Sequence, residues 1–489
     1  MPSTDHCPVC IKNPLEDSKN FTNVSWIQCD ICLQWFHSKC LDITLLEVAN
    51  LHSYHCQDCS KKHGGSIFKR KSKRTKTQID YVALNEGEAF AVDKLSHQHV
   101  SSFMKFPVDA SAEKVNPYIE IRDDLTKDFA LESELVKPIL IPRADLTKVG
   151  MELPIPKKDI TIEYITDKVG EDVLVEVMDV ISQQGVQPGW NMQKWRDYFQ
   201  TEEAVRDRIR NVISLEISQV EKLGTTFHRP QLVRDLDLVD KVWDPNDEQK
   251  RSQVTKYCLM SVKNSFTDFH IDFGGTSVYY TVCSGAKTFL MFPPTDENLQ
   301  CYTSWCLEPN QNYTWFADHS IMSKGKRLNP KNGFKVTLNV GDLFIIPSGW
   351  IHAVFTPQDS IVIGGNFLTL LNMRTQLKIN NIEKETKVPA KFRFPMFNKV
   401  HWLTSWYYLH HQDEFSNDLR PTPNVKLETP TAEIEYETLQ SLILHLNSHY
   451  ILSKTNQQAR RSIPINLIGR NIPKYLETLE SWLHSYKND

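Results

Sequence analysis

The chain has 489 residues, with 56 Lys and Arg against 60 Asp and Glu, so it exceeds one ordinary domain and its net charge of −4 indicates neither an acidic nor a basic partner. No apolar run is long enough to cross a bilayer, and the first residues lack the charged and apolar regions of a signal peptide. We therefore expect a soluble, intracellular protein of several domains that does not bind membranes.

The first 60 residues are rich in cysteine. Seven of the 11 cysteines lie there, and in a reducing compartment such clustering indicates metal ligands rather than disulfides. With one histidine they form four pairs, each separated by two residues: Cys7 and Cys10, Cys29 and Cys32, His37 and Cys40, Cys56 and Cys59. Eight ligands are enough for two tetrahedral zinc sites, and so short a segment needs them because apolar burial alone hardly holds it.

The order of these ligands, four cysteines, one histidine and three cysteines, resembles that of PHD fingers. A RING finger would place its histidine fourth, where this chain has Cys32. The resemblance implies a finger over residues 1–62 in which the pairs interleave. One zinc would be held by Cys7, Cys10, His37 and Cys40, and the other by Cys29, Cys32, Cys56 and Cys59.

Trp26 and Trp35 occupy positions where PHD fingers that bind trimethylated lysine place the aromatic residues of their cage. Indole faces attract a quaternary ammonium by cation–π forces, so the resemblance implies that the finger reads a histone tail, with methylated lysine 4 of histone H3 as the expected mark. The alternative is that both tryptophans pack a small core. Pro14 replaces a further cage aromatic of the family, which departs from the pattern.

A basic segment follows the cysteines. Residues 61–76 contain eight Lys or Arg and no acidic residue, so we expect a flexible linker over residues 63–77. Its two basic clusters resemble a bipartite nuclear localisation signal and could touch DNA phosphates without sequence preference. A merely solvated hinge is compatible with either role.

The central region, residues 78–369, contains candidate ligands for a second kind of metal. His270 and Asp272 are two residues apart, so on a strand both side chains leave the same face, and His352 lies far along the chain. Two imidazoles and one carboxylate that cap one face of a metal are the ligand set of non-haem Fe(II) oxygenases. The apolar run 343–346, followed by turn residues, favours a jelly roll. The alternative is that His352 is a core histidine.

Lys287 lies in an otherwise apolar strand, residues 286–292. Because lysine is almost never fully buried unless paired, we expect an anion beside it. That anion is either an acidic side chain or the distal carboxylate of 2-oxoglutarate, with Thr267 as a second donor. Strict alternation puts Thr267 on the face opposite His270, so the second interpretation requires a bend or bulge in that strand.

From residue 78 to about residue 400 the chain resembles JmjC histone lysine demethylases. Together with the finger, it is most similar to fungal demethylases of lysine 36 of histone H3 that join a PHD finger to a JmjC domain. The motifs that carry the resemblance are Val175-Glu-Val-Met-Asp-Val, Asn211-Val-Ile-Ser-Leu-Glu, Lys256-Tyr-Cys-Leu-Met-Ser-Val, Phe269-His-Ile-Asp-Phe-Gly-Gly-Thr-Ser-Val and Gly364-Gly-Asn-Phe-Leu.

The resemblance implies a double-stranded β-helix with flanking helices that holds Fe(II) through His270, Asp272 and His352. It also implies that 2-oxoglutarate is bound by Thr267, Lys287, Asn211 and Tyr280, and that Tyr280 and Asn366 lie close to the co-substrate and the methyl-lysine.

The reaction that the resemblance implies takes place in the nucleus, on the histone H3 tail of a nucleosome. Mono- and dimethyl marks on lysine 36 would be removed by N-methyl hydroxylation and release of formaldehyde. The alternatives are a chromatin reader with a vestigial oxygenase domain, or a protein or RNA hydroxylase.

The last region, residues 370–489, has the apolar spacing of helices and is expected to form a helical domain on the barrel. The residues that follow this spacing are Leu439, Leu442, Ile443 and Leu446, and later Leu476, Leu479 and Leu483. Their stripes are expected to be core, with Thr429-Pro430 as the start of the first of these helices.

Two further segments are candidates for contact with histone. Trp402, Tyr407 and Tyr408 lie in an aromatic-rich stretch that could present a histone-facing surface. The segment 308–333 is longer than is usual between barrel strands, and it either shapes histone access or is an inert loop.

Overall fold

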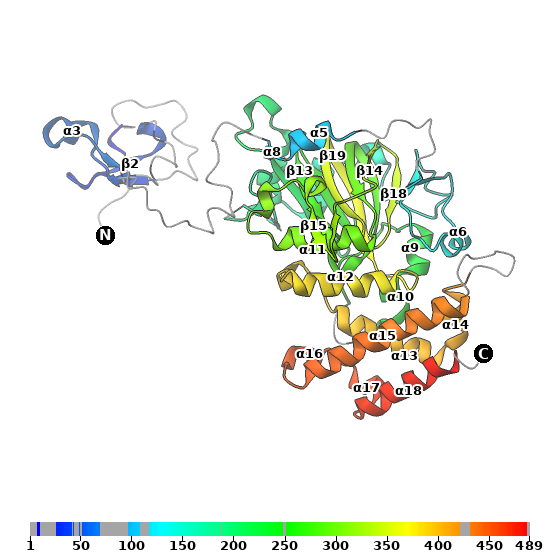
Figure 1. Cartoon of the computed structure of the whole chain (residues 1–489). Helices are drawn as coiled ribbons and strands as arrows, with labels where there is room; N and C mark the ends of the chain where they lie inside the picture. The colour runs from blue at the N-terminus through cyan, green and yellow to red at the C-terminus, as the bar shows by residue number, and fades with distance from the viewer. Residues whose placement is uncertain are drawn as a thin grey trace. The chain divides into compact units, whose positions relative to one another are not determined.

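The computed structural model describes residues 7–9, 26–41, 43, 48, 51–68, 96–107, 117–186, 188–247, 251–420 and 431–486. The chain divides into two compact units, Met1–Asp80 and Tyr81–Asp489, and each is considered by itself (Figure 1).

The first unit contains two short antiparallel hairpins. β1 (Trp26–Gln28) pairs with β2 (Trp35–His37), and β3 (Leu51–Ser53) pairs with β4 (Ile67–Phe68). A 3-10 turn, η1 (Lys39–Leu41), and a helix, α3 (Gln57–His63), complete its described elements. Because β4 belongs to this fold, the start of the basic linker predicted at residue 63 is too early; residues 69–77 of that linker lie outside the described residues.

The second unit begins with short elements, some of which form the two edges of its main sheet. They are α5 (Val100–Lys105), β5 (Glu120–Ile121), α6 (Lys127–Glu132), β6 (Ile139–Ile141), η2 (Lys157–Asp159), α7 (Ile162–Val169), β7 (Leu174–Val175), β8 (Met178–Asp179), β9 (Gln184–Gly185), β10 (Trp190–Asn191), α8 (Met192–Gln200) and η3 (Glu203–Val205). Local sequence accounts for two of the helix starts, because the side chains of Thr161 and Asn191 accept main-chain N–H bonds in the first turns of α7 and α8.

The main strands and their connections follow. They are β11 (Arg210–Glu216), α9 (Gln231–Leu236), α10 (Leu238–Val242), β12 (Tyr257–Ser261), β13 (Phe266–His270), η4 (Phe273–Gly275), β14 (Ser277–Phe292), α11 (Asp296–Leu307), β17 (Phe334–Leu338), β18 (Leu343–Ile346) and β19 (Ile351–Phe367). The apolar run predicted as a strand at 343–346 is β18, and all its residues are buried.

Two long strands, β14 with 16 residues and β19 with 17, organise this sheet. They pair with each other, and three register shifts in that pairing allow them to bend. The first part of β14 also pairs with β18 and the second part with β17. Likewise, the first part of β19 pairs with β13 and the second part with β12. This is the predicted double-stranded β-helix of the jelly-roll class.

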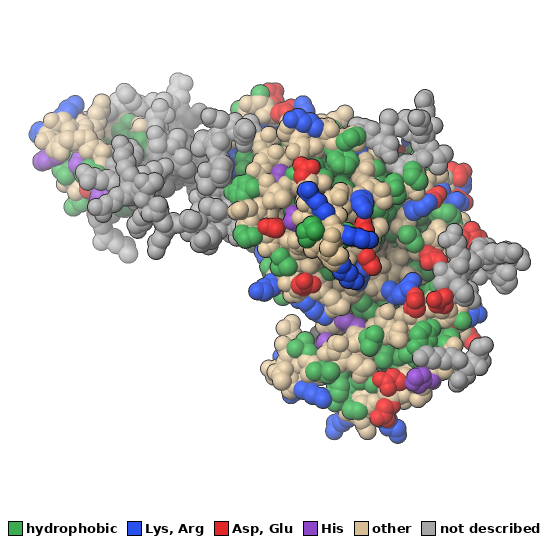
Figure 2. All heavy atoms as spheres, viewed as in Figure 1, with side chains coloured by type: hydrophobic (Ala, Val, Ile, Leu, Met, Phe, Trp, Pro, Cys, Tyr) green, Lys and Arg blue, Asp and Glu red, His purple; other side chains and the backbone are tan. Residues whose placement is uncertain are grey.

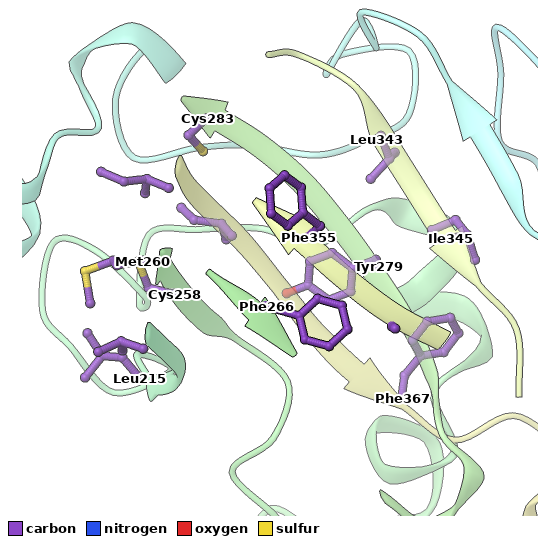
Figure 3. Close-up of a cluster of buried hydrophobic side chains, with 14 of the residues drawn as sticks. Leu215, Cys258, Met260, Phe266, Tyr279, Cys283, Leu343, Ile345, Phe355 and Phe367 are labelled. Atoms are coloured by element: carbon purple, nitrogen blue, oxygen red, sulfur yellow. The ribbon is translucent and has the colours of Figure 1, made fainter. Parts of the chain in front are cut away.

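Much of the core of this unit is built from apolar side chains on those strands. Figure 3 shows Phe266, Tyr279 and Phe355 gathered over the long strands, with Leu343 and Ile345 on their neighbour. Burying a side chain of this size stabilises the fold by about 1.5–3 kcal/mol. The strands that position the candidate metal ligands are therefore held by packing that does not depend on a metal.

The segment 308–333 forms η5 (Gln311–Tyr313), η6 (Phe316–Asp318) and a hairpin of β15 (Ile321–Ser323) and β16 (Lys326–Leu328). The ring centroids of Trp315 and Phe316 lie 4.9 and 5.1 Å from that of Phe269, on the strand that ends in His270. Part of this segment therefore packs against that strand, and its role in histone access stays a prediction.

The C-terminal region is helical, as predicted. Its elements are α12 (Met373–Glu385), η7 (Ala390–Phe392), α13 (Phe397–His410), α14 (Gln412–Asn417), α15 (Thr431–Ser453), α16 (Gln457–Arg461), α17 (Ile465–Ile468) and α18 (Ile472–Ser485). The predicted apolar stripes of α15 and α18 are buried in one core cluster, which confirms them as core. Thr429-Pro430 lies outside the described residues.

The aromatic-rich stretch lies on α13. The prediction of a histone-facing surface fails for Trp402 and Tyr408, because both are buried. Trp402 and Tyr408 are fully buried, because α13 packs against α10, α15 and α18. Tyr407 is half-buried and donates its hydroxyl hydrogen to Glu414. Aromatic content here reflects the core of the helical region.

The surface of the second unit carries both signs of charge. On the face drawn in Figure 2, the Lys and Arg side chains are interspersed with Asp and Glu over its described residues. None of the described helices has the length and apolar character needed to span a membrane.

Candidate functional site

The three candidate iron ligands come together. His270, Asp272 and His352 each offer one ligand atom, and these atoms lie within 4.8 Å of one another. The Nε2 atom of His352 is 3.8 Å from Oδ2 of Asp272, and the two imidazole centroids are 4.3 Å apart. Strand pairing explains this convergence, because β13 runs antiparallel to β19 with His270 directly opposite His352.

Both imidazoles are oriented by main-chain carbonyls. Nδ1 of His270 is 2.8 Å from the carbonyl oxygen of Asp268, and Nδ1 of His352 is 3.0 Å from that of Trp350. A carbonyl only accepts, so each Nδ1 carries the hydrogen and each Nε2 is left as the metal-binding atom. Burial, reinforced by His270, lowers the pKa of His352 to about 4. That histidine is therefore neutral near pH 7, as metal binding requires.

The bulge that the sequence required beside Thr267 is present. The register of β13 against β19 shifts between Thr267 and His270, so strict alternation is broken there. As a result the Thr267 hydroxyl reaches a polar chain on the inside of the barrel, where Nδ2 of Asn211 lies 3.5 Å from its Oγ1 atom.

Lys287 lies at the other end of this polar chain and is only 3 % exposed. Its Nζ atom donates to the hydroxyls of Ser261, at 2.5 Å, and Thr356, at 2.8 Å. Ser261 in turn donates to Oδ1 of Asn211 at 2.6 Å. Both hydrogen-bond partners of Lys287 are neutral hydroxyls. Among the described residues it therefore does not pair with an acidic side chain, which was the alternative. Burial lowers its pKa to about 7, and an anion beside it would restore the charged form.

Tyr280 and Asn366 are also buried within the barrel. The ring of Tyr280 is 5.3 Å from that of Phe289, which is 5.9 Å from the imidazole of His352. Tyr280 is thus one ring removed from a candidate iron ligand. Asn366, close to the end of β19, donates its side-chain N–H to the hydroxyl of Thr276, four residues beyond Asp272.

The sequence did not predict Ser261 and Thr356 as site residues, although both accept hydrogen bonds from Lys287. Ser261 left a weak signal, because it is a small polar residue in the apolar run that forms β12. Thr356 left none, since only the pairing of distant strands brings it to the lysine.

A further cluster, His97, His99 and Asp268, was also missed. Their candidate ligand atoms lie within 4.8 Å of one another. Nδ1 of His99 is 3.0 Å from the Asp268 carboxylate, and the main-chain N–H of His99 donates to Nδ1 of His97. Nε2 of His99 is buried without a hydrogen-bond partner among the described residues. The bond between His99 and Asp268 joins residues 96–107 to the strand that ends in His270.

Two surface cavities lie elsewhere on the second unit. One, of about 750 Å³, is lined by residues that include Glu163, Glu202 and Lys263, and the other, of about 300 Å³, by residues that include Arg229 and Arg251. In the second cavity both arginines pair with Asp240, which neutralises much of its positive charge. Neither cavity is lined by the three candidate iron ligands.

In the finger, the predicted ligands also gather. Cys29, Cys32, Cys56 and Cys59 form one group, and Cys7, His37 and Cys40 form a second, within 4.8 Å in each case. Cys10, the predicted fourth member of the second group, lies outside the described residues. Burial raises the pKa of the Cys29 thiol, but bonds from the N–H groups of Cys32 and Cys56 outweigh it and lower the value to about 6. Such a thiol readily becomes the thiolate that binds zinc.

Trp26 and Trp35 share the solvent-facing side of the β1–β2 hairpin. Trp26 pairs with His37 and Trp35 with Gln28, whereas Ile27 and Phe36 on the opposite side are buried. The two tryptophans are 38 % and 39 % exposed. This placement disfavours the alternative that both merely pack the core.

Comparison with known proteins agrees with this architecture. Residues 7–59 match the PHD-finger family, residues 158–374 the cupin-like domain family and residues 371–442 the Jumonji helical domain family. Each of three similar proteins is described as JmjC domain-containing histone demethylation protein 1. The protein from Debaryomyces hansenii is 59 % identical over 99 % of both chains, and that from Candida albicans is 57 % identical over 98 % of both. The protein from Saccharomyces cerevisiae is 39 % identical over 77 % of this chain and 82 % of its own.

The first two relatives align with both units of the chain, and the family matches cover the finger, the barrel and the first helices beyond it. The chain belongs to the family of JmjC domain-containing histone demethylation proteins.

Proposed function

We propose that the chain is an Fe(II)- and 2-oxoglutarate-dependent histone lysine demethylase. The observation that carries this proposal is the convergence of His270, Asp272 and His352, with both Nε2 atoms directed away from their carbonyl partners. Two imidazoles and one carboxylate fit ferrous iron and leave half of its coordination sphere open. The names of the relatives support the same activity.

The chain's own side chains prepare the site for its co-substrate. Lys287 and Thr267, linked through Ser261 and Asn211, would bind the distal carboxylate of 2-oxoglutarate, and Tyr280 would border it. The buried position of Lys287 strengthens that charge pair, because little water competes for the carboxylate. When bound, iron and 2-oxoglutarate supply an oxidant for C–H hydroxylation, whereas the protein supplies binding, orientation and a dry environment.

The substrate would be mono- or dimethylated lysine 36 of histone H3, presented on a nucleosome. Hydroxylation of an N-methyl group makes the carbon–nitrogen bond unstable, and the methyl carbon leaves as formaldehyde. Asn366, buried and held by Thr276, would lie close to the methyl-lysine.

Mass spectrometry over a panel of methylated histone H3 peptides tests the activity. Purified protein with Fe(II), ascorbate and 2-oxoglutarate should remove methyl groups from lysine 36 peptides and release formaldehyde, and the His270→Ala variant should not. A stable gain of one oxygen would instead favour a protein hydroxylase. Peptide binding without turnover would favour a reader with a vestigial oxygenase domain.

The finger would hold two zinc ions and read the tail of histone H3 methylated at lysine 4. The exposed indoles of Trp26 and Trp35 support this proposal, as do the two ligand groups behind them. Fluorescence titration of the full chain with trimethylated and unmethylated lysine 4 peptides tests it. Equal affinity for the two peptides would contradict reading of the mark.

The protein would act in the nucleus, and its basic residues 61–76 would add contact with DNA. Binding through phosphates weakens steeply with salt. The affinity of the chain for duplex DNA should therefore fall between 50 and 200 mM salt, and replacing the basic residues by Ser should remove this dependence.

A further inference from the structure

The turn that follows Asp272 is pressed against the helical region. In η4 both Gly274 and Gly275 have φ of +62°. A Cβ atom on Gly275 would lie 2.9 Å from Cβ of Ile379 on α12, and one on Gly274 would lie 2.9 Å from Cβ of Phe394. Only glycine allows so close an approach. The helical region therefore touches the main chain immediately beyond a candidate iron ligand.

A side chain of α12 also binds this turn. Oε1 of Glu383 accepts the main-chain N–H of Gly274 at 2.6 Å. From the other side, the hydroxyl of Ser348 donates to the carbonyl of Gly275 at 2.5 Å. The two bonds hold consecutive residues of the turn, so the main chain that leaves Asp272 has little freedom.

Burial of the Glu383 carboxylate costs free energy of folding. Its side chain belongs to a residue that is only 6 % exposed, and its Oε2 atom is buried without a hydrogen-bond partner among the described residues. Burial raises its pKa, and the Gly274 N–H, Arg393 and Lys384 only partly oppose that shift. An apolar residue would avoid the cost. The carboxylate is therefore better explained by its bond to the turn than by stability of the helix.

The opposite end of the ligand segment is held in a similar way. His99 binds the side chain of Asp268, whose carbonyl orients His270. His99 and Glu383 both lie outside residues 158–374, the match to the cupin-like domain. The barrel thus does not hold its own ligand segment alone.

We propose that Glu383 is a positioning residue for the iron site. By fixing the Gly274 N–H, it sets the direction of the main chain at Asp272 and hence of the carboxylate that binds iron. The Jumonji helical domain, through α12, is then part of the metal site and not only a cover for the barrel. This inference rests on the proposed iron site.

Titration with Co(II) tests the proposal in the full chain with zinc already in the finger. Co(II) binds the same kind of site as Fe(II), and its visible absorption reports ligand geometry. Loss of a side chain that orients a metal ligand weakens metal binding by about 10- to 100-fold, so Glu383→Ala should raise the half-saturating Co(II) concentration about tenfold. Glu383→Gln keeps a neutral acceptor oxygen and should raise it only about threefold.

Two controls separate positioning from stability. Glu385 lies exposed on the same helix, so Glu385→Ala should leave the Co(II) midpoint unchanged. Leu439 is in the core of the helical region, so Leu439→Ala should lower Tm and still leave the midpoint unchanged below the unfolding transition.

The proposal is overturned if Glu383→Ala binds Co(II) at the midpoint of the parent, or if Leu439→Ala shifts the midpoint as far. Should Glu383→Ala fail to fold, an unchanged midpoint in Glu383→Gln overturns it equally. Failure of the iron site itself looks different, because the parent would then bind no Co(II) that His270→Ala loses.

Discussion

The finger and the barrel use their candidate metal ligands in opposite ways. In the finger, Cys7, Cys29 and Cys56 are themselves core residues, packed with Ile27, Phe36 and Tyr54 in a small cluster of the described residues. In the barrel, His270 and His352 lie on strands that a large apolar core already holds, and Asp272 lies two residues beyond the end of one of them. We infer that the finger needs its metal ions to fold, whereas the barrel folds without metal and its fold then positions the metal ligands.

Removal of zinc should give the largest effect and tests the first half of this comparison. Structural zinc contributes about 10–16 kcal/mol in finger peptides, so a strong chelator should unfold residues 7–68. The fluorescence of Trp26 and Trp35 would report it, while the calorimetric transition of residues 81–489 should stay in place. A shift of that second transition would show that the units depend on each other.

Removal of a barrel ligand should destroy activity and spare the fold. His270→Ala takes one of three donors from the proposed iron, so demethylation of a lysine 36 peptide should fall by more than about 100-fold. Tm should change little, since the core of the barrel is intact. A variant that unfolds would contradict the idea that the strands, and not the metal, hold this region.

Loss of the buried lysine should selectively weaken the binding of 2-oxoglutarate. Lys287→Met removes the charge from the chain of hydroxyls, and loss of such a buried partner costs about 2–3 kcal/mol, which raises KM for 2-oxoglutarate about 30- to 160-fold. Lys335 is a matched control, because it is also buried but donates to main-chain carbonyls of Met104 and Phe106. Lys335→Met should leave that KM unchanged.

Acid should destabilise the helical region. Burial lowers the pKa values of His401 and His449 to about 4, and it also lowers that of His445 well below its usual range. Histidines of the unfolded chain bind protons near pH 6.5, so stability is full above that pH and is lost as pH falls toward 4. Each of the first two should cost about 2 kcal/mol between pH 7 and pH 5. Urea unfolding followed by circular dichroism at several pH values measures this slope, and His401→Gln should reduce it.

The smallest effect concerns the surface of the finger. A cation–π contact is worth about 0.5–2 kcal/mol, so Trp35→Ala should weaken binding of a trimethylated lysine 4 peptide by about 3- to 30-fold. The finger should stay folded, because Trp35 lies on the solvent side of its hairpin. Unchanged affinity would remove Trp35 from the proposed cage.

The sequence predicts features that depend on residues close together in the chain, and it does not predict contacts between distant segments. The cysteine pairs, the spacing of His270 and Asp272, and the apolar stripes of α15 and α18 are patterns of neighbouring residues. The structure gathers the described members of the first two and buries the stripes, as expected. The role of Ser261, Thr356 and Glu383 depends on segments far apart in the chain, so no local pattern marks it.

Two errors have physical causes of the same kind. Trp402 and Tyr408 were expected at a surface because composition does not report burial, and only the packing of α13 between other helices decides it. The linker was started too early because β4 pairs with β3 across the intervening helix. Both depend on tertiary partners.

The carbonyl acceptors behind His270 and His352 have an evolutionary consequence. Because they belong to the main chain, no replacement of the side chains at positions 268 or 350 deletes them. The path of the main chain thus fixes the tautomer of each ring, and substitutions of neighbouring side chains leave that tautomer unchanged. Changing it would require altering the paths of β13 and β19 themselves, which the core opposes.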